Sequence, residues 1–364
     1  MKIKHVTEIL EELAPLDYAE DFDNVGLLVG DAQEEVKGIL VTLDTLENVV
    51  DEALATDCNL IVSFHPIIFG GLKKLTGRTY VERTVIKAIR NGIAIYSMHT
   101  ALDNVRGGVN EKICETLGII HPKILIPKKG TLEKLVTYVP RKDAEPLRRS
   151  LFEAGAGNIG NYSDCSFNLE GTGSFRSGDE ADPVKGEIGK IHYEKETQIN
   201  VIYAKRLRNG ILASLFKNHP YEEVAYEVFA VQNTDQNLGM GMIGELPEPI
   251  AEREFLQRVK EKMNVSVVRH SAFLDQKVRT VAVLGGSGAF AIDAAKASGA
   301  DVLITSDIKY HEFYKAESKL VIADIGHYET EQFTKNLLVD YLTKKMPNFA
   351  VRLSESKTNP IKYL

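Results

Sequence analysis

Short, almost continuously apolar segments that alternate with helical patterns constrain the fold of this chain more than any other feature. Three of them, KGILVTLDT (37–45), NLIVSFH (59–65) and AIYSMHT (94–100), are each followed by a segment with helical spacing. Strands that are apolar at successive positions are typical of parallel or mixed sheets with helices on both faces. The pattern predicts an α/β fold over residues 1 to about 125.

The same alternation returns near the end of the chain. RTVAVLGG (279–286), ADVLITSD (301–308) and KLVIADIGH (319–327) are each followed by a helical pattern, and FAVRLSE (349–355) reads as a last strand. The chain is therefore predicted to contain two similar α/β halves with mixed sheets flanked by helices.

The middle of the chain has a different character. A strand (134–140) and a helix (143–156) lead into a long stretch rich in Gly, Ser and Asn, and a second strand follows at 199–205. This order predicts an inserted α+β module, and proline and glycine cluster at both of its ends. A chain of 364 residues is also too long for one ordinary core. We expect a first half at 1–128, the module at 129–240 and a second half at 241–364.

Composition and charge argue against several classes of protein. A net charge of -7 argues against a general nucleic-acid binder, which needs a basic face. The first fifteen residues do not form a signal peptide, and no apolar run approaches the ~18 residues of a membrane span. The three cysteines are far apart and form no CxxC pair, which fits a reducing compartment. The sequence predicts a cytoplasmic protein without membrane or nucleic-acid partners.

Four of the nine histidines lie at or just beyond the carboxyl ends of predicted strands: His65, His99, His311 and His327. In open α/β sheets this edge is where ligands bind. Two of them carry a carboxylate four residues later, Asp103 after His99 and Glu331 after His327. If the chain turns helical there, both side chains of each pair lie on one face and reach a common point.

Imidazole and carboxylate groups together suit zinc, iron or manganese, whereas calcium prefers oxygen ligands alone. The pattern predicts a transition-metal site that uses His65, His99, Asp103, His327 and Glu331. Histidines that cap strands by bonding to the backbone are the alternative, which explains any one of the residues but not the set. Five ligands suit two ions bridged by a carboxylate, roughly 3.5–4 Å apart, and such a pair activates water at neutral pH.

A glycine-rich segment offers a competing interpretation. Residues 286–291 read GSGAFA after a strand and before a helix, and Asp307 follows about 20 residues later, as in a loose dinucleotide fingerprint. The acidic residue, however, lies beside His311 rather than at the end of the second strand. Anion binding at the helix N-terminus and simple tight packing of helix on sheet remain open alternatives.

Six ordered segments resemble a known family, the NGG-interacting-factor-like proteins, often named GTP cyclohydrolase I type 2 homologues. The segments are DFDNVGLLVGD (21–31), SFHPIIFGGLKK (63–74), HTALDNVRGGVN (99–110), GGSG (285–288), TSDIKYH (305–311) and DIGHYETE (324–331). The resemblance implies a di-metal site whose ligands fall on the same five residues, and a toroidal homohexamer. It also implies that the middle segment is a PII- or CutA-like, ferredoxin-like module, whose usual ending is similar to HPYEEVAYEVF (219–229).

One departure from the family concerns the metal site. The family usually has two adjacent histidines where this chain has Phe64 and His65. The missing imidazole weakens one of the two ion positions, unless Phe64 points into the sheet, because neighbouring strand residues face opposite sides.

Function follows as a hypothesis with alternatives. The first is a metal-dependent hydrolase that acts on a nucleotide or phosphoester, with Glu331, Asp307 or His311 moving protons. The second is a metal-handling or regulatory protein whose inserted module senses a small molecule. The third is an oligomeric scaffold in which bound metal is incidental.

Overall fold

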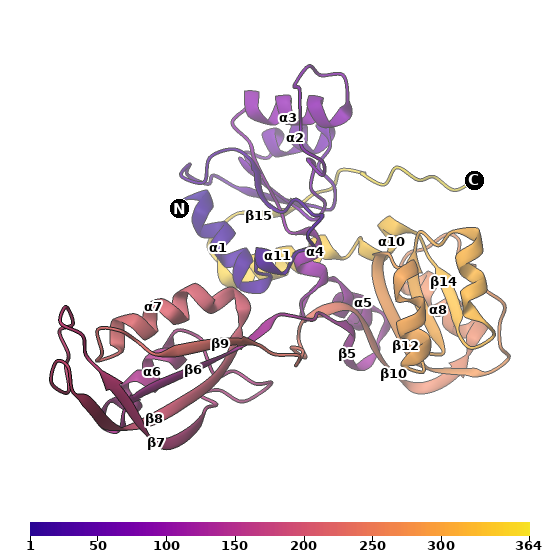
Figure 1. Cartoon of the computed structure of the whole chain (residues 1–364). Helices are drawn as coiled ribbons and strands as arrows, with labels where there is room; N and C mark the ends of the chain where they lie inside the picture. Colours follow the sequence, from indigo (N-terminus) through magenta and orange to yellow (C-terminus); the bar gives the residue numbers. More distant parts are fainter. The chain divides into compact units, whose positions relative to one another are not determined.

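Three β-sheets organise the chain, which this computed structural model describes over residues 1–364 (Figure 1). Two of the sheets belong to a unit made of residues 1–126 and 237–364, and the third belongs to a unit made of residues 127–236. The predicted mixed α/β fold, with mixed sheets flanked by helices, is confirmed.

The first sheet has five strands in the order β1 (Gly26–Val29), β4 (Ala94–Ser97), β3 (Leu60–Ser63), β2 (Ile39–Thr42) and β15 (Val351–Leu353). All neighbouring strands are parallel except β1, which pairs with β4 in the antiparallel sense. The helices of this region are α1 (Ile3–Leu13), α2 (Glu47–Ala55), α3 (Tyr80–Arg90), α4 (His99–Asp103) and α5 (Val109–Leu117).

Strand β2 shows why these segments are continuously apolar. Ile39 and Val41 point into the largest core cluster of the chain, whereas Leu40 points the other way into a second cluster that includes residues of α2 and α3. Successive strand residues face opposite sides of the sheet, so a strand covered on both faces has no place for a polar side chain. Figure 1 shows α2 and α3 together on one side of this sheet.

The second sheet has six strands in the order β11 (Arg269–His270), β14 (Val321–Asp324), β13 (Val302–Ser306), β12 (Lys277–Ser287), β10 (Gly239–Ala251) and β5 (Ile120–Pro127). Strands β12, β13 and β14 are parallel, as the sequence pattern predicts. The associated helices are α8 (Glu252–Lys262), α9 (Ile292–Ala297), α10 (His327–Glu331) and α11 (Thr334–Lys345).

The two sheets share one core. Val41 of the first sheet and Val283 of the second belong to the same cluster of fully buried residues, which also contains Leu338 of α11. The last strand strengthens this connection, because β15 leaves the second half and pairs with β2 in the first sheet. The carboxyl ends of both sets of parallel strands therefore belong to one unit.

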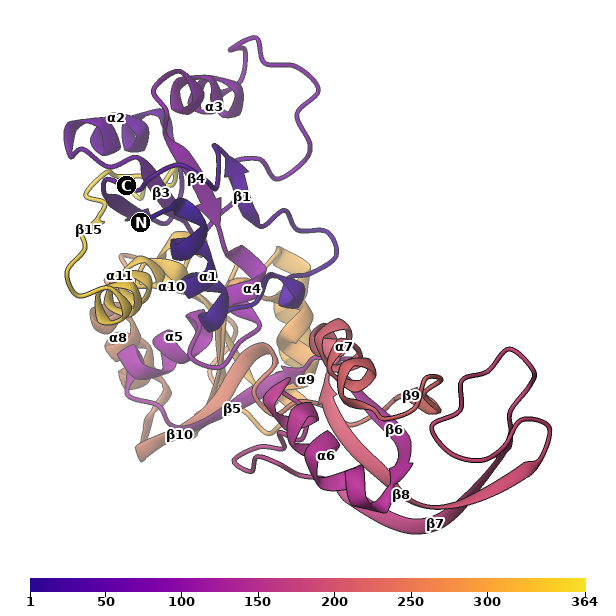
Figure 2. The ribbon, with the colours of Figure 1, turned by 90° about the vertical axis from the view of Figure 1, so that its left-hand side faces the viewer.

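The unit 127–236 has an antiparallel sheet in the order β7 (Phe167–Arg176), β8 (Ile191–Ala204), β6 (Leu132–Pro140) and β9 (Tyr226–Ala230). Helices α6 (Ala144–Glu153) and α7 (Arg208–Asn218) pack on one face of it around Leu135 and Ile199. This strand–helix–strand–strand–helix–strand order is the ferredoxin-like arrangement. The outer parts of β7 and β8 extend beyond β6 as a two-stranded arm (Figure 2).

No helix in the structure combines the length and apolar character that crossing a lipid bilayer requires.

Candidate metal centre

The candidate site lies at the carboxyl ends of parallel strands from both sheets. In the first sheet, Asp44 follows β2 and His65 follows β3, and these two strands are neighbours. In the second sheet, Asp307 follows β13 and His327 follows β14, which are also neighbours. Each sheet thus supplies one aspartate and one histidine from adjacent strand ends, where side chains point away from the sheet toward a ligand.

Three groups with metal-ligand chemistry converge here. One ligand atom from each of His65, His327 and Glu331 lies within 4.8 Å of the other two. Glu331 Oε2 is 3.0 Å from His65 Nε2 and 3.2 Å from His327 Nε2. The two short helices α4 and α10 begin at the histidines and end at the carboxylates, so each predicted helical i, i+4 pair is formed.

The two imidazole contacts to Glu331 are close but lack the direction of hydrogen bonds. Glu331 is only 3% exposed, and its Oε2 atom has no hydrogen-bond partner. A buried carboxylate oxygen without a donor is costly, whereas two nitrogens and an oxygen around a common point are the usual surroundings of a zinc or iron ion. The donor set therefore fits a divalent transition metal.

Each histidine of the site is oriented by its own carboxylate. The Nδ1 atom of His65 is 2.8 Å from Asp44, that of His99 is 2.8 Å from Asp23, and that of His327 is 2.7 Å from Asp307. The Nδ1 nitrogens donate these hydrogen bonds, so the Nε2 nitrogens are the ones that bind a metal once they lose their proton. Metal-ligating histidines almost always have such a partner on the other ring nitrogen.

His99 and Asp103 extend the site from helix α4. The His99 ring centroid lies 5.3 Å from that of His65, and Asp103 Oδ1 is buried without a hydrogen-bond partner. His99 and Asp307 both adopt positive φ angles, 25° and 56°, which most residues avoid. Strain of this kind persists where the surrounding structure holds a side chain in a required position.

Two glycines make room for the buried carboxylate. A Cβ atom on Gly286, which has φ +70°, would lie 2.5 Å from Glu331 Oε1 and 3.5 Å from His327 Cε1. A Cβ atom on Gly285 would lie 3.5 Å from Glu331 Cγ. Gly286 is thus a glycine because the site occupies the space of its side chain.

This packing accounts for the glycine-rich segment without a nucleotide. A Cβ atom on Gly288 would collide with the Thr305 hydroxyl, so this glycine allows β12 and β13 to approach each other. The segment continues as a 3₁₀ turn (Ala289–Ala291) and the six-residue helix α9. Of the alternatives left open by the sequence, tight packing is the one these contacts favour.

Electrostatic interactions in the site are strong. Burial alone would lower the pKa of His65, but the Asp44 and Glu331 carboxylates outweigh it and raise the pKa to about 10. Burial is outweighed in the same way at His327, whose pKa is raised to about 9 by Glu331 and Asp307. Burial raises the pKa of Asp103, and the Glu331 charge raises it further. The surplus of carboxylates around three imidazoles favours a cation.

Phe64, for which the family resemblance implies a histidine, is fully buried in the core. Its ring also lies against the site, with centroid distances of 4.9 Å to His65 and 5.6 Å to His99. The phenylalanine therefore lines the site on the side of His99 and supplies no ligand atom there.

Two of the residues expected to move protons have different surroundings. Asp307 is hydrogen-bonded to His327 and also accepts a hydrogen bond of 2.5 Å from the Ser287 hydroxyl. His311 lies in an exposed 3₁₀ segment (Tyr310–Ala316), where its ring contacts Tyr310 and Tyr314. His311 does not belong to the three-residue cluster.

Sequence reasoning did not assign roles to Asp44 and Asp23. A signal for Asp44 was present, because it follows the last apolar residue of the predicted segment 37–45, as His65 ends the segment 59–65. Asp23 precedes a strand and reaches His99 from 76 residues away, so no local pattern indicates their contact.

Comparison with known proteins places these observations in a family. Residues 1–360 match the family described as Duf34/NIF3 (NGG1p interacting factor 3). A Bacillus subtilis protein named GTP cyclohydrolase 1 type 2 homolog is 37% identical, over 99% of this chain and 98% of its own. A crystal structure of a Bacillus cereus protein related to NIF3 has a TM-score of 0.87 at 36% identity, covering 100% and 99% of the two chains. A Staphylococcus aureus protein has a TM-score of 0.81 at 29% identity, covering 100% and 99%. The chain belongs to the Duf34/NIF3 family.

Proposed function

We propose that this protein is a metal-dependent hydrolase that acts on a nucleotide or another phosphoester. The observation that carries the proposal is the convergence of His65, His327 and Glu331 at a strand-end edge, with both histidines oriented by aspartates. The name of the Bacillus subtilis relative, which refers to GTP cyclohydrolase, supports a nucleotide as substrate.

The residues that would hold the metal are His65, His327 and Glu331, with His99 and Asp103 available for a second ion. A divalent ion of zinc, iron or manganese would act there as a Lewis acid toward an oxygen of the substrate. A second ion is less well supported than the first, because Phe64, which lies beside His99, offers no ligand atom.

The chain's own groups have distinct tasks in this proposal. Asp44 and Asp307 hold His65 and His327 with their Nε2 atoms toward Glu331. Asp307 has a side chain that is 49% exposed, so it can also exchange a proton between His327 and solvent. Glu331 is the second proposed proton acceptor, and His311 becomes one only if a substrate brings its exposed ring toward the site.

The test is turnover by the full chain loaded with zinc, iron or manganese. GTP and bis(p-nitrophenyl) phosphate are offered to the wild type, to Glu331→Gln and to Glu115→Gln, which changes an exposed glutamate on α5. We expect hydrolysis that Glu331→Gln reduces by at least about 100-fold and that Glu115→Gln leaves unchanged.

A chain that retains its metal and hydrolyses neither compound would contradict the hydrolase. The second candidate, a metal-handling or regulatory protein, then accounts for the site. This candidate is favoured by a cavity in the unit 127–236, remote in sequence from every metal-site residue. It predicts ions that exchange readily, whereas a catalytic ion stays bound through purification.

The family resemblance also concerns the fold of the unit 127–236 and the assembly of the chain. We propose that the ferredoxin-like unit 127–236 is a PII- or CutA-like module, and that the chain assembles as a toroidal homohexamer. Light scattering of the full chain measures the assembly directly. A monomer at micromolar concentration would contradict it.

A further inference from the structure

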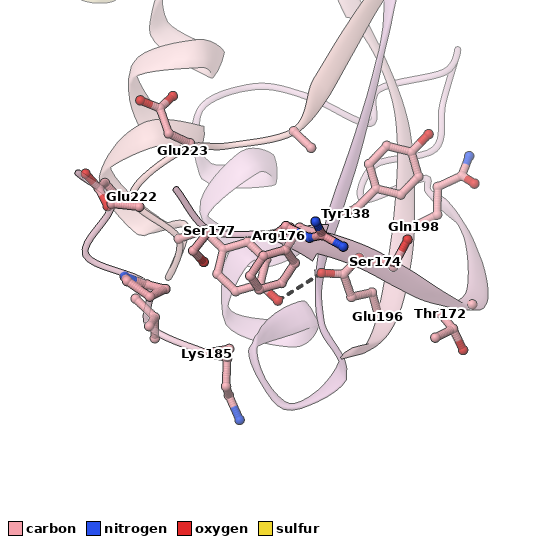
Figure 3. Close-up of a pocket in the computed structure, with 18 of the residues that line it drawn as sticks. Tyr138, Thr172, Ser174, Arg176, Ser177, Lys185, Glu196, Gln198, Glu222 and Glu223 are labelled. Carbon is pink, nitrogen blue, oxygen red and sulfur yellow. Dashed lines mark hydrogen bonds between the residues drawn. The ribbon is translucent and has the colours of Figure 1, made fainter. Parts of the chain in front are cut away.

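A cavity of about 610 Å³ lies in the unit 127–236 (Figure 3). The directions of the strand side chains place it on the face of the sheet away from α6 and α7. On β8, Ile199 and Val201 pack with the helices, so Glu196 and Gln198 point to the opposite face. Their register partners on β7, Gly171 and Leu169, share that face because directly opposed residues of antiparallel strands lie on the same side. Cavities of this size are typical of small-molecule sites.

The cavity exists because β7 lacks side chains at its centre. Gly171 has no neighbour within 4 Å of the position of a Cβ atom, and its φ angle lies outside the left-handed region. The rings of Phe175 and Tyr221, with centroids 6.1 Å apart, form a wall, and the segment 181–185 contributes further lining residues. Position 171 is therefore a glycine because a side chain there would fill the cavity, and not because the backbone requires one.

A buried carboxylate lies in this cavity without a cationic partner. Glu196 is 8% exposed, and its Oε1 atom accepts a hydrogen bond of 2.9 Å from the Tyr221 hydroxyl, drawn as a dashed line in Figure 3. No lysine, arginine or histidine nitrogen lies within ion-pair distance of Glu196. Its Oε2 atom has no protein donor and is open to the cavity, since it is not one of the fully buried oxygens without a partner. Burying a carboxylate is costly unless a cation or several donors accompany it.

The neighbouring basic groups do not supply that cation. His219 Nδ1 accepts a hydrogen bond from the Tyr221 amide, and its Nε2–H donates to the Tyr138 carbonyl, so the ring is neutral. Lys185 Nζ lies 3.8 Å from Glu194. Arg176 is exposed and pairs in register with Ile191, whereas Glu196 pairs with Gly171.

The lining as a whole is acidic. Its charged residues are Arg176, Lys185, Asp182, Glu196, Glu222 and Glu223, besides Glu170, whose carboxylate pairs with Arg141 and Thr197 on the other face of the sheet. A metal ion needs several ligands at one point, and the cluster of His65, His327 and Glu331 is the only such group of three in the structure. A single carboxylate between aromatic walls therefore suits an organic cation better than a metal ion.

We propose that this cavity binds a small organic cation with a flat apolar body, whose amidinium or ammonium group pairs with Glu196. The body occupies the space above Gly171, against the rings of Phe175 and Tyr221. Aromatic walls suit such a ligand because they contact its flat body and attract its charge. The inference does not depend on the chemistry of the metal site.

The test uses benzamidinium as the cationic probe, with benzamide and benzoate as neutral and anionic molecules of nearly the same shape. Binding to the full chain is measured by saturation-transfer NMR and calorimetry. We expect saturable binding of benzamidinium, and affinities for the other two that are lower by at least about tenfold.

Two variants test whether the probe binds in this cavity. Glu196→Gln removes the charge and lowers benzamidinium affinity about tenfold, and Gly171→Leu fills the open volume and abolishes binding. Their controls are Glu153→Gln, an exposed glutamate of the same unit, and Gly210→Leu, a glycine on α7 that also has open space around its Cβ position. Circular dichroism checks that each variant folds. If Glu196→Gln does not fold, the affinity of Gly171→Leu for benzamidinium tests the proposal without it.

Several results would overturn the proposal. These are equal binding of benzoate, wild-type affinity in Gly171→Leu, and no saturable binding of benzamidinium at millimolar concentration. A fourth is a smaller assembly of Gly171→Leu in analytical ultracentrifugation together with no effect of the probe, which would mean that a second copy of the chain occupies the cavity. Metal content and hydrolysis are unaffected by these variants, so failure here is distinct from failure of the proposed hydrolase.

Discussion

Single aspartates set the direction of each imidazole in the metal centre. Asp44 fixes His65 through Nδ1, so replacing it with asparagine removes the charge and allows the ring to turn. We expect Asp44→Asn to weaken metal binding about 10–100-fold while the fold is retained. A competition titration with a chromophoric chelator measures the change, and Asp51→Asn, an exposed aspartate on α2, is the control.

Gly286 tests whether the glycine-rich segment serves the metal centre. In Gly286→Ala the new methyl group lies 2.5 Å from Glu331 Oε1, so the carboxylate has to move and the bound metal content falls. Gly299→Ala is a matched control, because Gly299 also has a positive φ angle but nothing within 4 Å of its Cβ position. The two variants carry similar backbone strain. Equal metal content in both would mean that Gly286 has no steric role in the site.

Single residues also mark the limit of what the sequence predicts. The convergence of His65, His327 and Glu331 follows from strand ends and helical spacing, which are local patterns. The position of the Phe64 ring could not be predicted from such local patterns. Phe64 is buried in the core, and its ring still reaches His99, because the first residue beyond a strand no longer follows strict alternation.

The last strand and the segment after it connect the end of the chain to the metal centre. Beyond β15, the Thr358 hydroxyl donates a hydrogen bond of 2.8 Å to Asp44 Oδ2, the carboxylate that orients His65. We expect Thr358→Val to weaken metal binding several-fold and Thr358→Ser to restore it. The same chelator titration applies. Equal affinities in the valine and serine variants would exclude this role for the hydroxyl.

Helix α2 holds the same segment through a carboxylate. Glu52 accepts hydrogen bonds from the Ser354 hydroxyl and from the amides of Glu355 and Ser356. Burial alone would raise the pKa of Glu52, but these hydrogen bonds outweigh it and lower the pKa below its ordinary value of 4.5.

Because its pKa is lowered, ionised Glu52 stabilises the folded segment fully above the ordinary glutamate pKa. This stabilisation is lost as the pH falls through the lowered pKa. We therefore expect the protection of residues 351–358 against hydrogen exchange, relative to the intrinsic rate at each pH, to fall in acid before that of the core strands. In Glu52→Gln the same residues are expected to be less protected at neutral pH and to show little further change in acid. Protection that is independent of pH in the wild type would contradict this role.

At the scale of elements, the parallel strands and the helices at both i, i+4 pairs could be predicted, because their signals are local. The sheet to which β15 belongs could not be predicted. The segment FAVRLSE has the composition of a strand, but nothing in it indicates that it pairs with β2. The order of β6 to β9 follows from the family resemblance alone and not from local patterns, because β7 lies within a glycine-rich stretch that has few strand signals.

Across the whole molecule, the metal centre joins segments from the two ends of the chain. His65 comes from the first sheet and His327 and Glu331 from the second, and all belong to the unit 1–126 with 237–364. An ion that binds only the folded form adds about 2.7 kcal/mol of stability at a free concentration 100 times Kd. We expect zinc to slow hydrogen exchange in β3 and β14, and to leave β6 and β8 of the other unit unchanged.

The central claim is that the cluster of His65, His327 and Glu331 binds a transition metal. Elemental analysis of the tag-free full chain, before and after dialysis against a mild chelator, tests it most directly. We predict at least one zinc, iron or manganese ion per chain in the wild type and in Glu115→Gln, and loss of that ion in His327→Ala and Glu331→Gln. Equal metal content in all four proteins would contradict the assignment of the site.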